Sequence, residues 1–397
     1  MKYASVTDRL SGLGSAKWRV HIRARELAAE GREIIELTIG EPDVPCPPEM
    51  IEDAARAMAA GRTGYSNGRG EPALVEALAA RYSARRGRPV TAENIMCFPG
   101  TQTTLYAVFR AIAEDGDEVL VGDPLYASYE GVIESCGARV VPVPLRPEKG
   151  FRMQAADLAA RITPRSRVIF LNTPHNPTGA VLTRQDIADI GDLAIRHDLW
   201  IVSDEVYEDL VFAGAEFVSP LDFPELADRT IATASISKSH AAPGFRSGWC
   251  VGSAEFCERL LPLSETMLFG NQPFIADMTA RAISRPSPVA PGMAERFARR
   301  ADIIRHRLHG TAGLAVHRPD AGMFALVDVR ATGLSGQEFA GRLLEECGVA
   351  VMPGESFGQA LGGWLRLALT QPDEATTEAC RRIAAFALDL NRKGDAA

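Results

Sequence analysis

The sequence predicts an α/β protein with a large domain built on a mostly parallel, doubly wound sheet and a second, smaller α+β domain. A chain of 397 residues is long enough for two domains. From residue 95 to about residue 251, short apolar segments alternate with helical ones, which is typical of a parallel sheet covered on both faces. A proline-rich segment at residues 285–292 then precedes a different pattern.

These observations divide the chain into three segments. We expect residues 1–46 to form an N-terminal arm and part of the small domain, residues 47–285 the large domain, and residues 286–397 the small C-terminal domain.

Composition narrows the classes of function. Hydrophobic residues make up 46% of the chain and charged residues 24%, as in ordinary globular proteins. A net charge of -8 argues against nucleic acid as a partner, because phosphate backbones favour basic surfaces. The seven cysteines are scattered without a C-x-x-C pair, the first residues show no apolar run of the kind that leaders carry, and no run is long and apolar enough to span a bilayer. We expect a cytoplasmic protein that does not engage a membrane.

The N-terminal region is expected to begin with a helix, Ser15 to Glu30, closed by Gly31. A strand from Ile34 to Ile39 then leads into Gly40, whose main chain either faces a ligand or forms a plain turn. The glycine-dense loop at residues 61–70 holds Tyr65 and precedes a helix with apolar residues at helical spacing.

Six short apolar runs read as the strands of the large domain, each bounded by turn residues. They are residues 95–98, 118–121, 168–171, 200–202, 230–236 and 249–251. Open α/β sheets bind ligands at the carboxyl ends of their strands. Polar side chains that follow these runs are therefore candidate site residues.

An anion site is predicted from two of these strand ends. Gly100, Thr101 and Gln102 open a helix, where unpaired amides attract phosphate, although threonines there could equally serve as caps. Arg246 lies on a glycine-flanked turn and suits two-point binding of phosphate. Lys238, after the strand at 230–236, would lie beside it.

Three further strand ends carry candidate residues. Tyr126 is placed at the start of a helix, where it can stack on a planar ring or simply pack. Asn176 falls in a rigid loop between two prolines. Asp204, just before Tyr207, follows a strongly apolar strand, so it either caps a helix or is a buried carboxylate that needs a donor.

Ser235 and Lys238 also match the S-x-x-K pattern of serine β-lactamases and penicillin-binding proteins. That pattern requires S-D-N and K-T-G elsewhere, and neither string occurs. The hydrolase interpretation is therefore the weaker one.

The C-terminal region is expected to hold a helix through Phe297, a strand from Met323 to Val327, and a helix capped by Ser335 and Glu338 that stops at Gly348. Strands at residues 349–352 and 364–369 follow. Arg366 is the one charge in the last strand, which suits an internal ion pair or an anionic ligand such as a carboxylate.

Together these residues resemble the class I and II aminotransferases, pyridoxal 5′-phosphate enzymes of fold type I. The matching strings cover nearly the whole chain in the expected order. They are Gly40-Glu-Pro-Asp43, Tyr65, Gly100-Thr-Gln102, Pro124-x-Tyr126, Asn176-Pro-Thr-Gly179, Asp204-Glu-x-Tyr207, Ser235-x-Ser-Lys238, Gly244-x-Arg-x-Gly248 and Arg366.

The resemblance implies an aminotransferase that moves the amino group of an L-amino acid to a 2-oxo acid through a Schiff base on Lys238, which would also move the proton. It implies that Asp204 keeps the ring nitrogen protonated, and that Asn176 and Tyr207 bind the 3′ oxygen. It further implies that Tyr126 stacks on the ring and that the phosphate is bound by Ser235, Arg246 and the Gly100–Gln102 segment, with Tyr65 from the second subunit of a homodimer. The substrate would be bound by Gly40, Asn176 and Arg366.

Within the family, the runs at residues 237–240, 267–270 and 319–324 are most like the bacterial arginine–pyruvate transaminases. We expect arginine or another basic or broad donor, with pyruvate as an acceptor and with Glu265 or Asp277 as possible partners of a basic side chain. The alternatives are an aspartate or broad-specificity aminotransferase, a pyridoxal-phosphate-dependent Cβ lyase of the same fold, and a non-catalytic binding module.

Overall fold

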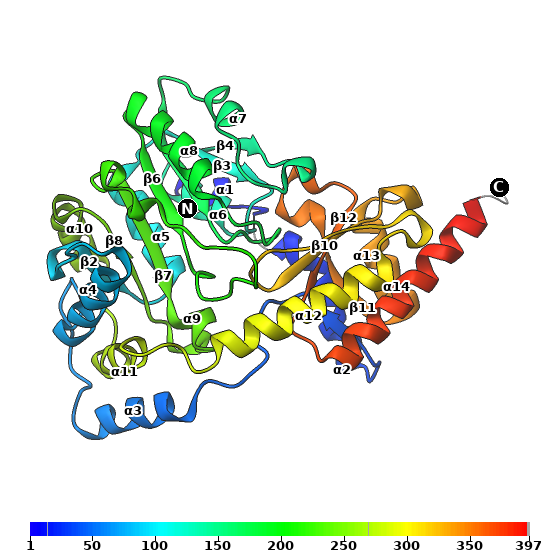
Figure 1. Cartoon of the computed structure of the whole chain (residues 1–397), viewed down its shortest axis with the longest axis horizontal. Coiled ribbons are helices and arrows are strands. Elements are labelled where there is room, and N and C mark those ends of the chain that lie inside the picture. Colours follow the sequence, from blue (N-terminus) through cyan, green and yellow to red (C-terminus); the bar gives the residue numbers. More distant parts are fainter. Residues whose placement is uncertain (14, 269, 395–397) are drawn as a thin grey trace.

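The computed structural model describes residues 1–13, 15–268 and 270–394. Two lobes are visible in Figure 1, each built around its own sheet, and helix α12 (Ala290–Leu308) runs from one lobe into the other. The division at residues 46 and 285 stays a prediction.

The large sheet has seven strands. In spatial order they are β2 (Ile95–Phe98), β8 (Gly248–Val251), β7 (Thr230–Ser235), β6 (Trp200–Asp204), β5 (Ser166–Asn172), β3 (Glu118–Asp123) and β4 (Arg139–Pro144). From β4 through β7 every neighbouring pair is parallel, and β8 is antiparallel to both of its neighbours. The predicted mostly parallel α/β sheet is confirmed.

Helices cover both faces of this sheet because successive strand residues point to opposite sides. Val168 and Phe170 of β5 pack with α5 (Thr101–Ile112), α6 (Tyr129–Ser135) and α10 (Ala254–Met267). Ile169 and Leu171 face the other side, where α8 (Arg184–Arg196) and α7 (Ala155–Ala159) pack. Further along that side lie α3 (Pro48–Ala59), α4 (Pro72–Arg86) and α11 (Pro273–Ile283).

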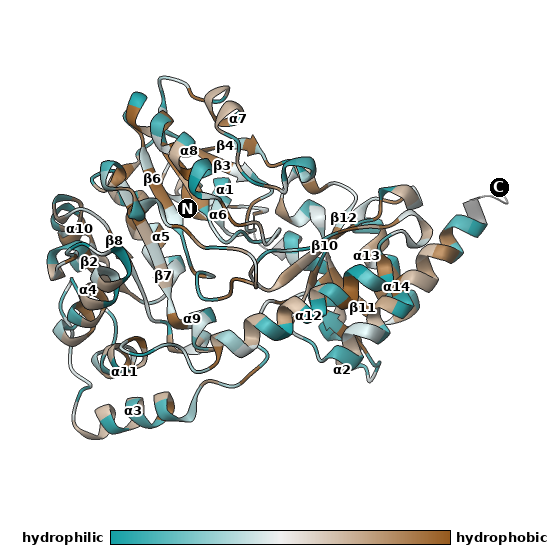
Figure 2. Ribbon diagram, in the orientation of Figure 1, coloured by the Kyte–Doolittle hydropathy of each residue, from teal (hydrophilic) through white to brown (hydrophobic). Residues whose placement is uncertain are grey.

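The small sheet has five strands, and the N-terminal region supplies one of them. In order they are β1 (Ile35–Leu37), β11 (Val349–Pro353), β12 (Trp364–Ala368), β10 (Phe324–Asp328) and β9 (Ala315–His317). Helices α2 (Arg19–Ala29), α12, α13 (Gly336–Cys347) and α14 (Asp373–Gly394) pack around it. Figure 2 shows hydrophilic and hydrophobic residues alternating along α12 and α14, as expected of helices with one buried face.

Several predicted boundaries are confirmed. Strand β2 spans the predicted residues 95–98. The Ser335 hydroxyl accepts the main-chain N–H of Glu338, whose carboxylate in turn accepts the N–H of Ser335, and Gly348 ends α13 in a left-handed conformation. The capping box and the glycine stop are therefore both present.

Other boundaries were wrong. The predicted strand at residues 230–236 ends at Ser235, because the Ser235 side chain accepts the N–H of Ser237 and begins the short helix α9 (Ile236–Ser239). Tyr126 does not begin a helix, since α6 starts at Tyr129 after Ser128.

At the N-terminus the expected helix from Ser15 is a short 3-10 turn, residues 15–18, followed by α2. The expected strand at residues 34–39 is limited to β1, because only Ile35 to Leu37 pair with β11. Beyond Leu37 the main-chain oxygen of Thr38 accepts a hydrogen bond from Arg366 of β12, and that of Gly40 accepts one from Lys238, which follows a strand of the large sheet. Across the described residues, no helix is long and apolar enough to span a membrane.

Candidate active site

A cavity of about 280 Å³ contains most of the residues predicted to form a site. It lies where the carboxyl ends of β5, β6 and β7 face the small sheet. The predicted residues that line it are Gly40, Thr101, Gln102, Tyr126, Asn176, Asp204, Tyr207, Ser235, Lys238, Arg246 and Arg366. Residues from both sheets therefore meet in one space.

Lys238 reaches across this cavity from the large sheet to the N-terminal region. Its Nζ donates a hydrogen bond to the main-chain oxygen of Gly40 at 2.7 Å. Burial, together with the positive charges of Arg366 and Arg246, lowers the pKa of Lys238 to about 8, although the negative charge of Glu41 opposes the shift. A sizeable fraction of this amine is therefore neutral, and nucleophilic, near neutral pH.

The N-terminus of α5 and Arg246 form a cradle for an anion. No side chain caps α5, and the buried hydroxyl of Thr101 has no hydrogen-bond partner among the described residues. A Cβ placed on Gly100 would lie 2.2 Å from a guanidinium nitrogen of Arg246. Only glycine allows the arginine to lie this close to the helix N-terminus, so the predicted phosphate-binding residues fit a phosphate.

Asp204 lies buried at the end of β6. Its carboxylate accepts the hydroxyl hydrogen of Tyr129 at 2.8 Å and the N–H of Val206 at 3.2 Å. Burial raises the pKa of Asp204 to about 6, against the lowering effect of these two donors. The alternative role as a helix cap is excluded, because no helix starts at this point. A buried carboxylate of this kind suits a cationic N–H on a ligand.

Asn176 and Tyr207 lie next to each other on the cavity wall. The Asn176 side-chain amide donates to the Tyr207 hydroxyl at 3.5 Å, and its oxygen accepts from Arg366 at 3.2 Å. Both side chains are buried. Together they present an amide and a hydroxyl donor side by side, as a phenolate-like ring oxygen would require.

Arg366 is completely buried, with its guanidinium between two aromatic rings. The ring centroids of Phe324 and Phe357 lie 3.9 and 4.3 Å from it. The Nε atom has no hydrogen-bond partner among the described residues, and burial lowers the pKa of the guanidinium to about 10. A buried cation that lacks a carboxylate partner fits an anionic group of a ligand.

Four predicted residues, among them the exposed Glu265 of α10, lie outside the cavity lining. Gly100 is adjacent to it, against Arg246. Tyr65 is 95% exposed on its loop and does not line the cavity of its own chain. Asp277 pairs with Arg62 at 2.7 Å, so within one chain it is already neutralised. The run at residues 267–270, used for the resemblance, includes residue 269, which lies outside the described residues.

The sequence missed several residues of the cavity wall, among them Trp18, Ile39, Tyr129 and Phe324. Trp18 directly precedes α2, and Ile39 follows β1. Nothing in the local sequence distinguishes either residue from an ordinary core residue. Tyr129 follows Tyr126 by three residues, a spacing that could have placed the two rings on one side of a turn. Phe324 could have been inferred only from its pairing with the strand of Arg366.

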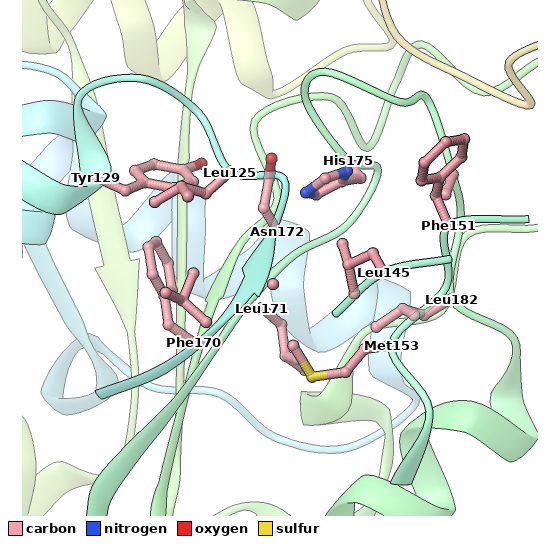
Figure 3. Close-up of a pocket in the computed structure, with 13 residues that line it drawn as sticks. Leu125, Tyr129, Leu145, Phe151, Met153, Phe170, Leu171, Asn172, His175 and Leu182 are labelled. Carbon is pink, nitrogen blue, oxygen red and sulfur yellow. The ribbon is translucent and has the colours of Figure 1, made fainter. Parts of the chain in front are cut away.

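A second cavity, shown in Figure 3, lies behind Tyr129 and is lined mainly by apolar side chains. Leu125, Leu145, Phe170 and Leu182 point into it, and its volume is about 20 Å³. This space is large enough for one water molecule and too small for a cofactor or substrate. The first cavity is therefore the candidate active site.

Comparison with known proteins agrees with this chemistry. The family model for aminotransferase class I and II matches residues 32–383. Arginine–pyruvate transaminase AruH of Pseudomonas aeruginosa is 46% identical over 98% of this chain and 99% of its own length. Aspartate/prephenate aminotransferase of Cereibacter sphaeroides is 34% identical over 93% of this chain and 95% of its own.

Solved structures show the same fold. Aspartate aminotransferase from Thermus thermophilus with maleate superposes with a TM-score of 0.90 at 32% identity, over 97% of this chain and 100% of that chain. Aspartate aminotransferase from Rhizobium meliloti gives a TM-score of 0.92 at 28% identity, over 98% and 99%. These matches, with the cavity between the two sheets, show that the chain belongs to the class I and II aminotransferases and is a pyridoxal-phosphate-dependent aminotransferase.

Proposed function

We propose that the cavity binds pyridoxal 5′-phosphate between Lys238 and Asp204 and that the enzyme moves the amino group of arginine to pyruvate. The observation that carries the site assignment is the meeting of Lys238, Asp204, Arg246 and Arg366 in one cavity. When bound, the cofactor supplies an aldehyde for an amine and a ring that stabilises negative charge on the substrate Cα.

Lys238 has two roles in this proposal. Its amine, partly neutral because burial lowers its pKa to about 8, would be the group that holds the cofactor aldehyde covalently, with loss of one water molecule. When it is free, the same amine would hold and move the proton at the substrate Cα. The hydrogen bond to the oxygen of Gly40 keeps the amine inside the cavity when it is not bonded.

The other side chains bind and orient. Asp204 would accept a hydrogen bond from the ring nitrogen, Asn176 and Tyr207 would donate to the 3′ oxygen, and Tyr126 would pack on the ring; all four line the cavity. The α5 N-terminus at Gly100, Thr101 and Gln102, together with Ser235 and Arg246, binds the phosphate. Arg366 binds the substrate α-carboxylate beside Gly40, at an Nε that has no partner among the described residues.

Arginine is proposed as donor because the relative named for arginine–pyruvate transfer is 46% identical, against 34% for an aspartate/prephenate aminotransferase. Aspartate remains the second candidate donor, because relatives with that name match almost as much of the chain. No residue is assigned to the donor side chain, since Asp277 is paired with Arg62 and Glu265 is an exposed residue of α10.

A donor screen tests this assignment. The purified holoenzyme is given arginine, lysine, aspartate or phenylalanine with either pyruvate or 2-oxoglutarate, and the new amino acid is measured by chromatography. The expected result is the highest kcat/KM for arginine with pyruvate. Turnover of aspartate with none of arginine would contradict the donor assignment while leaving the aminotransferase assignment intact.

We also propose a homodimer in which Tyr65 of one subunit reaches the phosphate in the other. Its support is the 95% exposure of Tyr65 on a glycine-rich loop and the resemblance described above. Mixing Lys238→Ala with Tyr65→Ala chains tests this proposal, since a hybrid dimer would contain one complete site. If activity returns on mixing, the active site contains residues of both subunits. If the mixture stays inactive, the proposed sharing of sites is contradicted.

A cytoplasmic location is proposed on the state of the thiols. All seven cysteines are unpaired, and five of them are buried. Free thiols in this number suit a reducing compartment.

A further inference from the structure

Tyr129 occupies a fixed position at the back of the active site. It is the first residue of α6 and is almost fully buried. Its ring makes edge contacts with Phe170, at 4.6 Å between centroids, and with Tyr126, at 5.4 Å. Figure 3 shows the same ring next to Leu125, on the side of the cavity where Phe170 also lies. Packing on several sides leaves the hydroxyl one direction in which to point.

That direction is toward Asp204. The Tyr129 hydroxyl donates to Oδ2 of Asp204 at 2.8 Å, and the N–H of Val206 donates to Oδ1 at 3.2 Å. Burial and the nearby carboxylate raise the pKa of Tyr129 well above its usual value, so the phenol stays protonated and remains a donor. Each carboxylate oxygen thus has one donor and retains lone pairs for a third group.

The main chain of Asp204 is fixed independently. The side-chain amide of Asn172 and the N–H of Thr173 both donate to its main-chain oxygen, at 3.0 and 3.1 Å. These bonds set the position of the Asp204 Cα but leave the side-chain torsions free. The contact with Tyr129 is the only side-chain hydrogen bond to this carboxylate among the described residues.

We propose that Tyr129 is a positioning residue that holds the Asp204 carboxylate in the orientation and the ionised state in which it faces the cofactor ring nitrogen. This inference rests on the proposed function, because the contact of Asp204 with the ring nitrogen is part of that proposal. Two effects follow from the geometry. The Tyr129 hydroxyl removes the rotational freedom of the carboxylate, and it stabilises the charged form of a group that burial pushes toward the neutral form.

The other groups around the Asp204 carboxylate do not duplicate this role. The hydroxyl of Tyr207 is hydrogen-bonded to Asn176, and Tyr207 has no hydrogen bond to Asp204 among the described residues. Lys238, Arg246 and Arg366 line the same cavity, yet none of them has a hydrogen bond to Asp204 among the described residues. Removal of the Tyr129 hydroxyl therefore leaves Asp204 with the N–H of Val206 alone.

The first test is the affinity of the full-length apoprotein for pyridoxal 5′-phosphate, measured by equilibrium dialysis between pH 5.5 and 8.5. Tyr129→Phe keeps the ring packing and loses only the hydroxyl. Tyr106→Phe is the matched control, because Tyr106 packs against the same hydrophobic cluster and has no hydrogen bond to Asp204 among the described residues. We expect Tyr129→Phe to bind the cofactor about ten-fold more weakly than the wild type near pH 6.5. This difference in affinity should become smaller toward pH 8.5, and the control should show no difference.

The pH dependence follows from the loss of a donor. Without the hydroxyl the pKa of Asp204 rises further above its present value of about 6, so the carboxylate protonates at a higher pH. The acid limb of the binding curve must therefore move to higher pH in Tyr129→Phe. A curve of wild-type shape would overturn the proposal.

A double-mutant cycle shows whether Tyr129 acts through Asp204. In an Asp204→Asn background the carboxylate no longer ionises, so adding Tyr129→Phe should change the cofactor affinity by less than about two-fold. An equal effect in both backgrounds would show a purely structural role and contradict the proposal. Binding of a cofactor analogue with carbon in place of the ring nitrogen should be equal in wild type and Tyr129→Phe, and it also reports whether the variant folds.

Failure of this inference and failure of the proposed function give different results. If Tyr129→Phe behaves like Tyr106→Phe while the wild-type protein binds the cofactor through Lys238, only the role of Tyr129 is wrong. If the wild-type protein forms no bond between Lys238 and the cofactor, the proposed function itself fails.

Discussion

The amine of Lys238 donates a hydrogen bond to the main-chain oxygen of Gly40, 2.7 Å away. The two residues belong to different lobes, since Lys238 follows a strand of the large sheet and Gly40 follows β1 of the small sheet. The active site is thus closed by a direct contact between the lobes. The pKa of about 8 that burial gives the amine makes this contact sensitive to pH.

Capture of the cofactor by the apoprotein should therefore depend on pH. Only the neutral amine attacks an aldehyde, and a pKa lowered to about 8 makes the neutral form dominant above that pH. We expect the rate constant for capture, followed by stopped-flow absorbance, to rise between pH 7 and 9 with a midpoint of about 8. A midpoint near the ordinary lysine value would show that the amine is solvated.

Gly100→Ala should weaken cofactor binding through Arg246. The added Cβ would lie 2.2 Å from the guanidinium and would displace it from the α5 N-terminus. Gly150→Ala is the control, because Gly150 also has a positive φ but has nothing within 4 Å of its Cβ. Both variants should lose stability to backbone strain, Gly100→Ala more so because its φ of 85° and ψ of 162° suit glycine alone, and only Gly100→Ala should lose about ten-fold or more in affinity for pyridoxal 5′-phosphate. Equal affinities in the two variants would remove Arg246 from the phosphate site.

Arg366→Lys should raise KM for every amino-acid donor by a similar factor. Lysine retains the charge but loses the planar two-point geometry, and it cannot stack between Phe324 and Phe357 as the guanidinium does. We expect a loss of about 2–3 kcal/mol in kcat/KM, measured by steady-state kinetics with three donors. An increase confined to one donor would mean that Arg366 reads the donor side chain and not the α-carboxylate.

Asp204→Asn should stabilise the apoprotein at neutral pH. The pKa of Asp204 is raised to about 6, so between its ordinary value and pH 6 the folded state binds more protons than the unfolded state, and stability falls as pH rises. Above pH 6 the folded protein bears the full free-energy cost of burying the ionised Asp204 carboxylate. Asparagine is uncharged and removes this cost. The expected gain is of the order of 2–3 kcal/mol near pH 7.5 and close to zero at pH 4, read from urea unfolding of the cofactor-free protein.

A gain in the Asp204→Asn apoprotein that is the same at both pH values would contradict the titration account. The same variant should lose most of its aminotransferase activity, because a neutral amide cannot balance a protonated ring nitrogen. A variant that is more stable and less active would show that the buried carboxylate of Asp204 lowers stability and is needed for activity.

Local sequence predicted the large sheet well. Strand β2 carries a continuous apolar run bounded by turn residues and was placed at its observed limits. Strand β4 was not predicted, because Pro142 and Pro144 argue against a strand, yet at the edge of the sheet proline costs little. The early end of β7 depends on a hydrogen bond from Ser237 to the side chain of Ser235, which no apolar pattern reveals.

The candidate site could be predicted where a polar residue follows an apolar strand. Lys238, Asp204 and Asn176 met that condition, and all three line the cavity. Tyr129 and Trp18 did not, since one begins a helix and the other comes from a distant segment of the chain. Their positions depend on how the elements pack together, and local sequence does not encode such contacts.

The most direct test of the central claim is borohydride reduction of the holoenzyme followed by peptide mapping. Reduction makes the bond between a lysine amine and the cofactor permanent, so the modified residue can be identified by mass spectrometry. We expect a single pyridoxyl group on Lys238 in the wild type and none in Lys238→Arg. A modification on another lysine, or an unmodified wild-type peptide, would contradict this expectation.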